Sequence, residues 1–474
     1  MRITVVGLGY VGLVSAAGLT TWNHDVVGIE VDRTRLDALA RGETPLFEPG
    51  LDGLLEEATR TGRLRYTDSV ESSVPQAQVV IIAVGTHDGS GGWQTETIRA
   101  ALQAIVPAMA PDAVLTIRST LPPEFVPEIV GLAHRLREEV GAERVPVLTN
   151  PEFTRESTAV ADFLQPDRVV IGILDDPVGR GVRALKRVYR LVDAPILVLP
   201  AADAGMAKLG ANLFLATKIS FANELATLCE AFGADVDAVV HAMSFDPRIG
   251  GSFLRAGIGF GGSCLPNQVA MTIRSSREAG LPTPLLGAVD GVNRGQRVRF
   301  VDRMSRMLDG LAGRRVALLG LTFKPGTDDL RDAPALTIAR DLIDLGADVV
   351  AYDPMPNARV RAAALVPGLQ VVASVQAALA DADAAGLLTE WPEFAALDWG
   401  SVRSLMRGTV VLDGRNALSP DAMQAAGFDY AGFGRRIPAA EPRSLAGRPA
   451  ITSHDGDVLS EIASAATGAA AGKS

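Results

Sequence analysis

Cys264 is the residue of this sequence best placed to do chemistry. It follows two glycines and a serine in the segment 261-GGSCLPNQ-268, and a proline stands two places after it. A cysteine thiolate is a strong nucleophile that can add to an aldehyde carbon. A structural role is the alternative, because free cysteine is among the most buried residue types. The glycines of 258-IGFGGSCLP-266 favour a backbone that wraps closely around a ligand, which points to chemistry at Cys264.

Lys208 and Asn212 form a second candidate group. Their i, i+4 spacing places both side chains on one face of a helix, where a cation and an amide could hold an oxyanion. A surface lysine beside a packing asparagine is the alternative. The sequence has 45 Lys and Arg residues and only five of them are lysines, so a lysine retained in a motif is notable.

Two polar loops add a carboxylate and a hydroxyl. Glu152 lies in 149-TNPEFTRES-157 and Thr120 lies in 118-RST-120, and both loops follow predicted strands. Ligands of an open α/β sheet bind at that edge, so both side chains could contact substrate or water.

The charged segment 323-FKPGTDDLRDAP-334 carries two further cations. Lys324 and Arg331 could bind a phosphate or sugar hydroxyls. A solvated charged loop is the alternative.

The N-terminal motif 7-GLGYVG-12 predicts a dinucleotide site. Gly7 permits a tight turn, Gly9 lets the backbone approach a pyrophosphate, and Gly12 lets a helix pack on a strand. Glu30 ends the second predicted strand, where an acid can bond the adenosine ribose. Since its carboxylate disfavours a 2′-phosphate, the sequence predicts NAD rather than NADP.

The hydrophobic pattern predicts the elements that position these residues. Short apolar runs suited to buried strands occur at 3–7, 26–30, 79–85, 113–117, 145–149 and 168–172. Helical stretches alternate with them, which predicts a parallel α/β sheet. The stretch 203–233 has helical spacing and is long enough to join two domains or two subunits. The run 315–354 echoes residues 1–32 and predicts a second Rossmann-like unit.

We therefore expect an α/β protein with two Rossmann-like domains and a long helix between them. The expected division is an N-terminal dinucleotide-binding domain at 1–200, a central helical region at 201–299, a C-terminal Rossmann-like domain at 300–440 and a disordered tail at 441–474.

The amino-acid composition limits which ligands and partner molecules the protein is expected to bind. The net charge is −10 and the pI is near 5.2, which argues against nucleic acid or an anionic membrane. Cys229 and Cys264 cannot form a disulfide framework and fit a reducing compartment. No apolar run reaches the ~18 residues of a membrane span, so we expect a cytoplasmic protein. The five histidines are scattered without ligand spacing, and we expect no metal.

Several motifs, in their order and spacing, resemble the UDP-glucose/GDP-mannose dehydrogenase family. They are GLGYVG, PLFEPGL, NPEFTRES, DAGMAKLGANLFLATKISFANE, RIGGSFLRAGIGFGGSCLP, GLTFKPGTDDLRDAPAL, TEWPEF and DGRN, between residue 1 and about 436. The resemblance implies oxidation of the C6 alcohol of a nucleotide sugar to a carboxylate, with two NAD and no metal. It also implies a homodimer through the central helix and a nucleotide-sugar site in the C-terminal domain. NPEF, PLFEPGL, TEWPEF and DGRN are more similar to the UDP-glucose branch, whereas Leu265 also occurs in GDP-mannose enzymes.

The resemblance further implies roles for individual residues. Cys264 matches the nucleophile that holds a thiohemiacetal and then a thioester, and Lys208 and Asn212 match the pair that stabilises the oxyanions. Thr120 and Glu152 match residues that position a water near the nicotinamide. Matches to cofactor contacts are Gly7, Gly9, Tyr10, Val11, Gly12, Glu30, Arg35, Thr86, Thr120, Glu152 and Arg331. Matches to substrate contacts are Phe153, Lys208, Asn212, Phe253, Leu254, Arg255, Gly257, Gly261 and Lys324.

Asn267 and Gln268 depart from the family pattern Cys-Phe/Leu-Pro-Lys-Asp. A glutamine side chain cannot accept a proton. We therefore expect the early oxidation steps to proceed and the final hydrolysis of the thioester to be slow. Without a carboxylate at residue 268, we also expect the Cys264 thiol to be ionised. We expect Lys208 to lack an anionic partner, which would lower the pKa of Lys208.

The expected reaction is the conversion of UDP-glucose to UDP-glucuronate. Three alternatives stay open because of the two amides: an enzyme that stops at the aldehyde, an enzyme for GDP-mannose or another nucleotide sugar, and a nucleotide-sugar-binding protein without catalysis.

Overall fold

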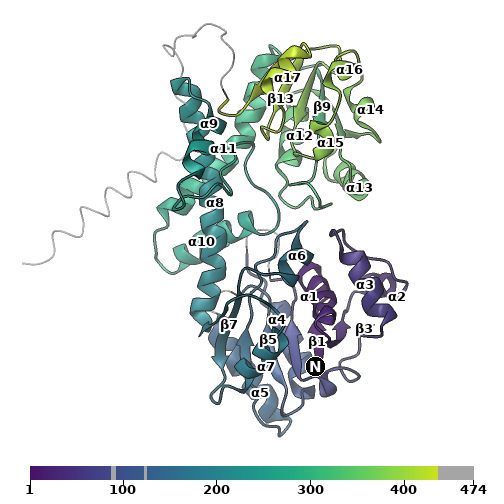
Figure 1. Cartoon of the computed structure of the whole chain (residues 1–474), viewed down its shortest axis with the longest axis vertical. Helices are drawn as coiled ribbons and strands as arrows, with labels where there is room; N and C mark the ends of the chain where they lie inside the picture. Colours follow the sequence, from purple (N-terminus) through teal and green to yellow (C-terminus); the bar gives the residue numbers. More distant parts are fainter. Residues whose placement is uncertain (87–91, 122–124, 436–474) are drawn as a thin grey trace, which may run out of the picture. The chain divides into compact units, whose positions relative to one another are not determined.

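The N-terminal sheet forms from the short apolar runs that the sequence predicts. The computed structural model describes residues 1–86, 92–121 and 125–435, so the predicted tail at 441–474 lies outside the described residues. Within these ranges the sheet has eight strands in the order β3-β2-β1-β4-β5-β6-β7-β8 (Figure 1). The strands are β1 (Arg2–Val6), β2 (Asp25–Ile29), β3 (Leu64–Thr67), β4 (Val79–Ile82), β5 (Val114–Ile117), β6 (Val147–Thr149), β7 (Val169–Asp175) and β8 (Ile196–Pro200).

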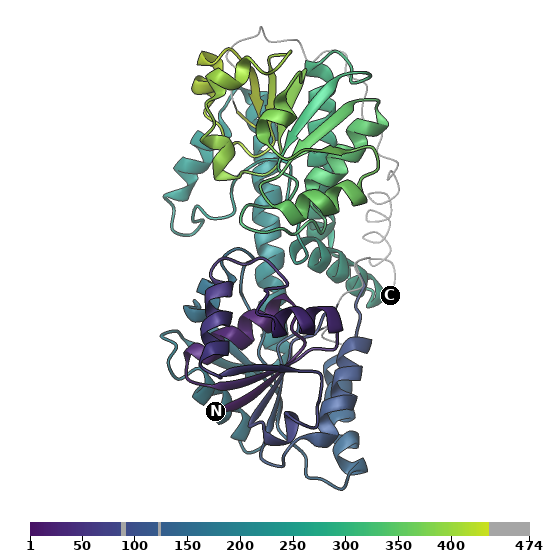
Figure 2. The ribbon, with the colours of Figure 1, turned by 90° about the vertical axis from the view of Figure 1, so that its right-hand side faces the viewer.

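Helices cover both faces of this sheet (Figure 2). On β4, Val79 and Ile81 pack into one apolar cluster and Val80 and Ile82 into another, because successive side chains point to opposite faces. Both faces are therefore buried, which explains the continuous apolar runs. The helices are α1 (Tyr10–Thr21), α2 (Arg33–Ala40), α3 (Leu51–Arg60), α4 (Glu96–Ile105), α5 (Val126–Glu139), α6 (Ala159–Leu164) and α7 (Arg180–Val188), with short 3-10 turns at Val74–Gln76 and Val106–Ala108.

The strand β7 departs from the parallel sheet that the sequence predicts. It pairs antiparallel with β6, whereas the other neighbours in this sheet pair in parallel. An antiparallel strand starts at the edge where its partner ends. The chain between Thr149 and Val169 therefore stays at the carboxyl edge of the sheet, where an open α/β sheet binds its ligands.

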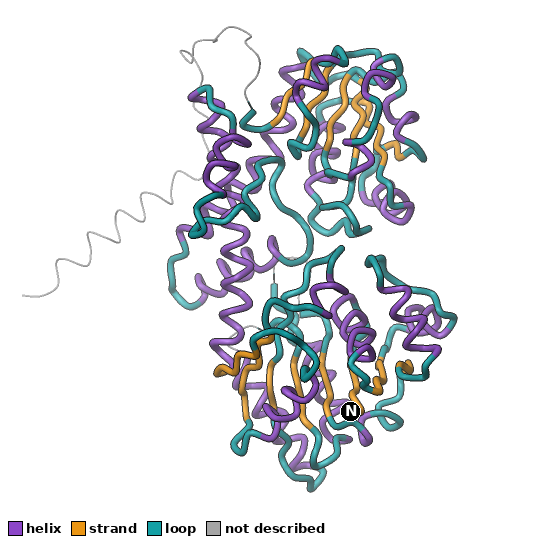
Figure 3. The backbone as a smooth tube through the Cα atoms, viewed as in Figure 1, coloured by secondary structure: helices purple, strands orange, loops and turns teal. Residues whose placement is uncertain are grey.

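A second sheet repeats the doubly wound pattern and is parallel throughout. Its six strands within the described residues have the order β11-β10-β9-β12-β13-β14. Figure 3 shows the strands of both sheets in orange, with helices in purple beside them. They are β9 (Arg315–Leu319), β10 (Asp348–Tyr352), β11 (Gln370–Val371), β12 (Ala384–Leu387), β13 (Val410–Asp413) and β14 (Asp429–Gly432). The accompanying helices are α12 (Pro334–Asp344), α13 (Pro356–Leu365), α14 (Val375–Leu379), α15 (Pro392–Ala395), α16 (Trp399–Arg403) and α17 (Pro420–Ala425).

One long helix links the two sheets. The helix α8 runs over Ala201–Phe232 without interruption and ends at Gly233, whose φ of 71° is the left-handed conformation that glycine adopts at helix ends. The helices α9 (Val236–Ser244), α10 (Leu265–Glu278) and α11 (Pro284–Met307) follow it, and α10 and α11 pack against it. The described residues belong to one compact unit, and the predicted α/β fold with two Rossmann-like sheets and a connecting helix is confirmed.

An apolar seam runs along α8 on the side away from its packed face. Phe214, Phe221 and Leu228 recur every seven residues and are 64%, 50% and 47% exposed, and Phe232 is 82% exposed. Side chains seven residues apart lie on one face of a helix. Such a seam on a single chain leaves a large apolar surface in contact with water.

Candidate functional site

A cavity of about 1000 Å³ gathers most of the predicted site residues. Those that line it are Gly9, Tyr10, Val11, Thr86, Thr120, Glu152, Phe153, Lys208, Asn212, Phe253, Arg255, Gly261, Cys264, Gln268, Lys324 and Arg331. Gly7, Gly12, Glu30, Arg35, Leu254 and Gly257 lie outside its wall. We call this space the main cavity.

Cys264 stands at the N-terminal end of α10 and opens into the main cavity. Its side chain is accessible from the cavity although protein surrounds it on the other sides. Burial raises the pKa of the thiol, and the carboxylate of Glu152 raises it further against the opposing charge of Lys208. The predicted ionised resting state is therefore wrong, because burial disfavours the thiolate and Glu152 places a second negative charge beside it. The thiol lies 3.7 Å from Ser263 Oγ.

Lys208 is buried and ion-paired. Its Nζ lies 2.9 Å from Glu152 Oε1, and the second oxygen of Glu152 accepts from the backbone N–H and the hydroxyl of Thr154 at 2.6 and 2.5 Å. Burial opposes ionisation of Glu152, but Lys208 and Thr154 outweigh it and keep the pKa of this carboxyl below its usual range. The prediction that Lys208 has no anionic partner is wrong, because Glu152 supplies the charge that Gln268 does not.

Gln268 and Asn267 both have defined partners. Gln268 is buried, and its Oε1 accepts from Asn212 Nδ2 at 2.9 Å. Asn267 Nδ2 donates to the backbone oxygen of Ser263 at 2.8 Å, in the turn that carries Cys264. The two amides thus hold neutral hydrogen bonds where the family pattern has a cation and an anion.

Glu156 is a titratable group of this site that the sequence predictions missed. Its Oε1 lies 3.5 Å from Ser263 Oγ and 3.1 Å from Arg331 Nη2, and its backbone oxygen accepts from Lys324 Nζ. Its Oε2 is buried and has no hydrogen-bond partner among the described residues. Burial and the nearby Asp329 raise the pKa of Glu156 to about 7. Its position in NPEFTRES, one helical turn's length after Glu152, was the available signal.

The GLGYVG loop has the geometry of a phosphate-binding turn. Gly7 has φ 88°, which suits glycine, and a Cβ on Gly12 would lie 1.8 Å from Gly7 O. A Cβ on Gly9 would meet nothing within 4 Å, so open space lies above the start of α1. Within the described ranges no side chain caps α1, and its first backbone N–H groups are suited to bind an anion. These residues fit the pyrophosphate of a dinucleotide.

Glu30 lies at the end of the second strand as predicted. Its carboxylate accepts from the backbone N–H groups of Leu8, Val31 and Asp32 and from Arg35 Nη1. Burial acts against ionisation, but the Asp32 N–H and the Arg35 guanidinium keep the pKa of Glu30 below its usual value. Arg35 therefore serves here to fix the carboxylate.

Glu48 ties the cofactor loop to the NPEFTRES loop. The hydroxyl of Tyr10 donates to Glu48 Oε2, and the same carboxylate accepts from the backbone N–H groups of Ser157, Ala159 and Val160 at 2.8, 2.7 and 3.4 Å. The N–H groups of Ala159 and Val160 belong to the first turn of α6, and Ser157 precedes this helix. We call this arrangement the Glu48 clasp.

The predicted substrate contacts fall into two groups. Phe253, Arg255, Gly261 and Lys324 line the main cavity. Phe253 has φ 64°, a conformation that costs free energy for a residue with a Cβ and clusters at ligand sites.

Leu254 and Gly257 are buried outside the cavity wall. Leu254 is part of the apolar core, and the Gly257 N–H donates to Asn223 Oδ1 at 2.8 Å. In this chain Leu254 and Gly257 therefore stabilise the packing around the site and do not line the main cavity.

Arg415 is a further lining residue that the sequence predictions missed. It donates to three backbone oxygens, those of Leu388, Gly259 and Phe323, at 2.8, 2.8 and 3.2 Å. It thereby joins the cysteine loop to the second sheet. The DGRN motif contains this residue, but its spacing alone does not reveal the carbonyls it reaches.

Two features are absent from the described residues. No helix there has both the length and the apolar character that crossing a membrane requires. No three His, Cys, Asp or Glu side chains of the described ranges come together as a metal ion would need.

Comparison with known proteins assigns three segments of the chain. Residues 1–193 match the NAD binding domain of the UDP-glucose/GDP-mannose dehydrogenase family, residues 202–295 its central domain and residues 317–420 its UDP binding domain. The UDP-glucose 6-dehydrogenase of Rhizobium meliloti is 39% identical over 443 residues, which cover 92% of this chain and 100% of the relative. The UDP-glucose 6-dehydrogenase of Pseudomonas aeruginosa is 40% identical over 446 residues, 92% of this chain and 98% of the relative.

Solved structures agree with this assignment. A UDP-glucose dehydrogenase from Pyrobaculum islandicum superposes with a TM-score of 0.83 at 37% identity, over 92% of this chain and 98% of that one. A UDP-D-ManNAc dehydrogenase from Pyrococcus horikoshii has a TM-score of 0.81 at 27% identity, over 92% of this chain and 100% of that one. The protein belongs to the UDP-glucose/GDP-mannose dehydrogenase family, and its N-terminal domain is the NAD-binding domain of that family.

Proposed function

We propose that this chain oxidises the C6 alcohol of UDP-glucose to the carboxylate of UDP-glucuronate, with two NAD as acceptors. The observation that carries the proposal is the main cavity, which Cys264, Lys208 and Asn212 line together with Gly9, Tyr10 and Val11 of the GLGYVG loop. The choice of sugar nucleotide rests on the UDP-glucose 6-dehydrogenases that are 39% and 40% identical to this chain.

The proposal divides the work among three regions. Residues 1–200 hold NAD through the GLGYVG loop and Glu30, residues 201–299 supply the reacting side chains, and residues 300–440 hold the nucleotide. Bound NAD supplies a hydride acceptor. The homodimer of the proposal forms through the exposed seam of α8, since Phe221, Leu228 and Phe232 otherwise face water.

Lys208 and Asn212 can each stabilise an oxyanion without losing their present partners. The Lys208 ammonium has three donors and gives one to Glu152, and the Asn212 amide has two and gives one to Gln268. A donor of each remains for the oxygen of the substrate. Charge that develops on this oxygen is stabilised most strongly in a dry site.

Glu156 is the proposed acceptor for the proton of Cys264. The thiol proton passes to Ser263 Oγ, whose own proton passes to Glu156, over separations of 3.7 and 3.5 Å. The thiolate then adds to the C6 aldehyde and forms the thiohemiacetal. With a pKa of about 7, Glu156 is suited to hold this proton near neutral pH.

Gln268 affects the last step of the proposed reaction. Water must lose a proton when it cleaves the thioester, and the amide of Gln268 cannot accept one. Glu152 is engaged by Lys208 and Thr154. The proposal therefore includes a thioester on Cys264 that accumulates during turnover.

The proposal is tested with a panel of nucleotide sugars and NAD, read by NADH yield and product mass. Two NADH per UDP-glucose and a covalent adduct on Cys264 in quenched enzyme are expected, and the adduct disappears in Cys264→Ser. One NADH per sugar would replace the proposal with an oxidation that stops at the aldehyde. Binding of sugar nucleotides without any NADH would leave a non-catalytic binding protein.

A further inference from the structure

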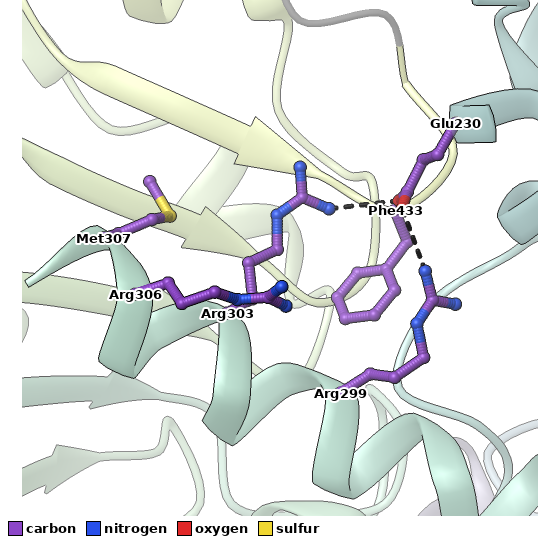
Figure 4. A pocket seen from close by; sticks show the side chains of 6 residues that line it. All are labelled: Glu230, Arg299, Arg303, Arg306, Met307 and Phe433. Carbon is purple, nitrogen blue, oxygen red and sulfur yellow. Dashed lines mark hydrogen bonds and ion pairs between the residues drawn. The ribbon is translucent and has the colours of Figure 1, made fainter. Parts of the chain in front are cut away.

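A second cavity lies on the far half of α8 from the reacting residues. Its volume is about 290 Å³, and Glu230, Arg299, Arg303, Arg306, Met307 and Phe433 line it (Figure 4). We call it the arginine pocket. Glu230 follows Asn212 by 18 residues on the same helix, which at 1.5 Å per residue is about 27 Å. The arginine pocket is therefore separate from the main cavity.

The three arginines share one face of α11. Their spacing of four and three residues stacks the side chains on successive turns, and Figure 4 shows them along one side of the helix. Arg299 Nη2 and Arg303 Nη1 pair with the two oxygens of Glu230 at 2.9 and 3.1 Å. Among the side chains that line the pocket, this single carboxylate faces three guanidinium groups, which leaves two positive charges in excess.

Glu230 does not reach the third arginine in this structure. Besides the two guanidinium groups, its Oε1 accepts from the backbone N–H of Gly434 at 2.8 Å. Within the described part of the chain, Arg306 makes one hydrogen bond, from Nε to the Asp302 oxygen of its own helix at 3.2 Å. Its terminal nitrogens have no acceptor there.

Arg303 is the most enclosed of the three, with 14% of its side chain exposed. Its Nη1 donates to Glu230 and, at 2.7 Å, to the Gly432 oxygen, whereas Nε and Nη2 have no acceptor among the described residues. Burial lowers the pKa of Arg303, and the charges of Arg299 and Arg306 work in the same direction against Glu230. An anion beside Arg303 and Arg306 would relieve this repulsion.

We propose that the arginine pocket is a binding site for a phosphoryl dianion, held by Arg303 and Arg306. The two positive charges in excess over the cluster match the two charges of the dianion, and the planar forks of Arg303 and Arg306 suit the tetrahedral oxygens of phosphate. Phe433 forms an apolar wall, and Arg299 and Arg303 lie over its ring at 5.6 and 6.0 Å. The ligand class is inorganic phosphate or the phosphate group of a small phosphorylated metabolite.

The test is titration of the full chain with inorganic phosphate at constant ionic strength, followed by calorimetry and by the shift in Tm. Phosphate binding to the native protein is expected, and Arg306→Gln should weaken it by about tenfold, the loss of one charge-assisted contact. In the part of the chain that the structure describes, Arg306 has no partner on another element, so its replacement should leave the fold intact. Arg303→Lys keeps the charge but loses the fork and should also weaken binding.

Two controls make the outcome decisive. Arg314 is an exposed arginine of the same domain outside the pocket, and Arg314→Gln should bind phosphate as the native protein does. Lys324→Gln removes a cation from the main cavity. Binding that Lys324→Gln abolishes and Arg306→Gln leaves unchanged would place the phosphate in the main cavity and overturn the proposal, as would a native protein that binds no phosphate. The affinities for glucose 1-phosphate and for inorganic phosphate are then compared. Tighter binding of glucose 1-phosphate would indicate a site for a phosphorylated metabolite, and tighter binding of inorganic phosphate would indicate a site for the free anion.

Discussion

Asn212 Nδ2 donates to Gln268 Oε1 over 2.9 Å, joining α8 to α10 one turn beyond Cys264. Two amides thus meet where the family pattern has an amide and a carboxylate. The pair keeps Asn212 oriented into the main cavity, so the position next to the nucleophile retains its geometry. It loses the ability to take up a proton, which bears on the hydrolysis of an acyl-enzyme more than on its formation.

Gln268→Asp should accelerate the slow step. A carboxylate at residue 268 can assist water, and general-base help of this kind is typically ~10²–10⁴-fold. The native protein should show a burst of NADH and then slow turnover, and the variant should turn over steadily without a burst. Stopped-flow absorbance of NADH measures both phases. Gln268→Asn, which has the length of Asp without its charge, should retain the burst. Steady native turnover that Gln268→Asp does not change would contradict this role.

The pH dependence of the reaction should report Glu156. Since burial raises the pKa of this carboxyl to about 7, its ionised form, which accepts the proton, becomes populated as the pH rises through 7. The rate at which the second NADH forms, which follows addition of the thiolate to the aldehyde, should therefore rise through this range, and Glu156→Gln should abolish this rise.

Glu152→Gln is the matched control for the pH profile. It breaks the ion pair with Lys208 and should lower the rate, but the pKa of Glu152 lies below its usual range, so the rise near pH 7 should remain. If the rate of Glu156→Gln still rises with pH near 7, the group that titrates there is not Glu156.

The native protein should prefer NAD over NADP by at least about tenfold in kcat/KM, because the ionised Glu30 repels a 2′-phosphate. Glu30→Ser removes the charge and frees Arg35 from its ion pair, so the preference should narrow. Steady-state kinetics with both cofactors measure the ratio. Equal kcat/KM values in the native protein would refute the assignment of Glu30.

The seam on α8 should hold two chains together. Phe221→Arg with Leu228→Arg places two charges in the seam and should convert a dimer to a monomer in light scattering at micromolar concentration. Val360→Arg is the control, because Val360 is 74% exposed on α13, away from the seam. A native protein that is already monomeric would remove the basis of this prediction.

The sequence was informative wherever a local rule determines the structure. The turn at Gly7, the helix that follows Gly9 and the acid at Glu30 lie within one strand-helix-strand unit, and the main cavity contains the predicted Cys264, Lys208 and Asn212. The antiparallel direction of β7 could not be read from its apolar run, because both directions bury the same side chains.

The electrostatics of the site depended on contacts distant in sequence. Lys208 has its anionic partner 56 residues upstream in Glu152, and Glu156 owes its raised pKa to burial and to Asp329 from the second sheet's first loop. No spacing rule links these residues. The predictions for Lys208 and Cys264 therefore failed although the residues themselves lie in the expected cavity.

The Glu48 clasp links the GLGYVG loop and the NPEFTRES loop through one shared carboxylate. Tyr10 belongs to the turn that receives the dinucleotide phosphates, and Ser157 ends the loop that carries Glu152 and Glu156, yet both bond one carboxylate. Because both loops bond Glu48, we expect a ligand that orders one loop to order the other as well. The expected outcome is positive cooperativity between cofactor and sugar nucleotide, in which each raises the affinity of the other by the same factor, and titration of one ligand with and without the other measures it.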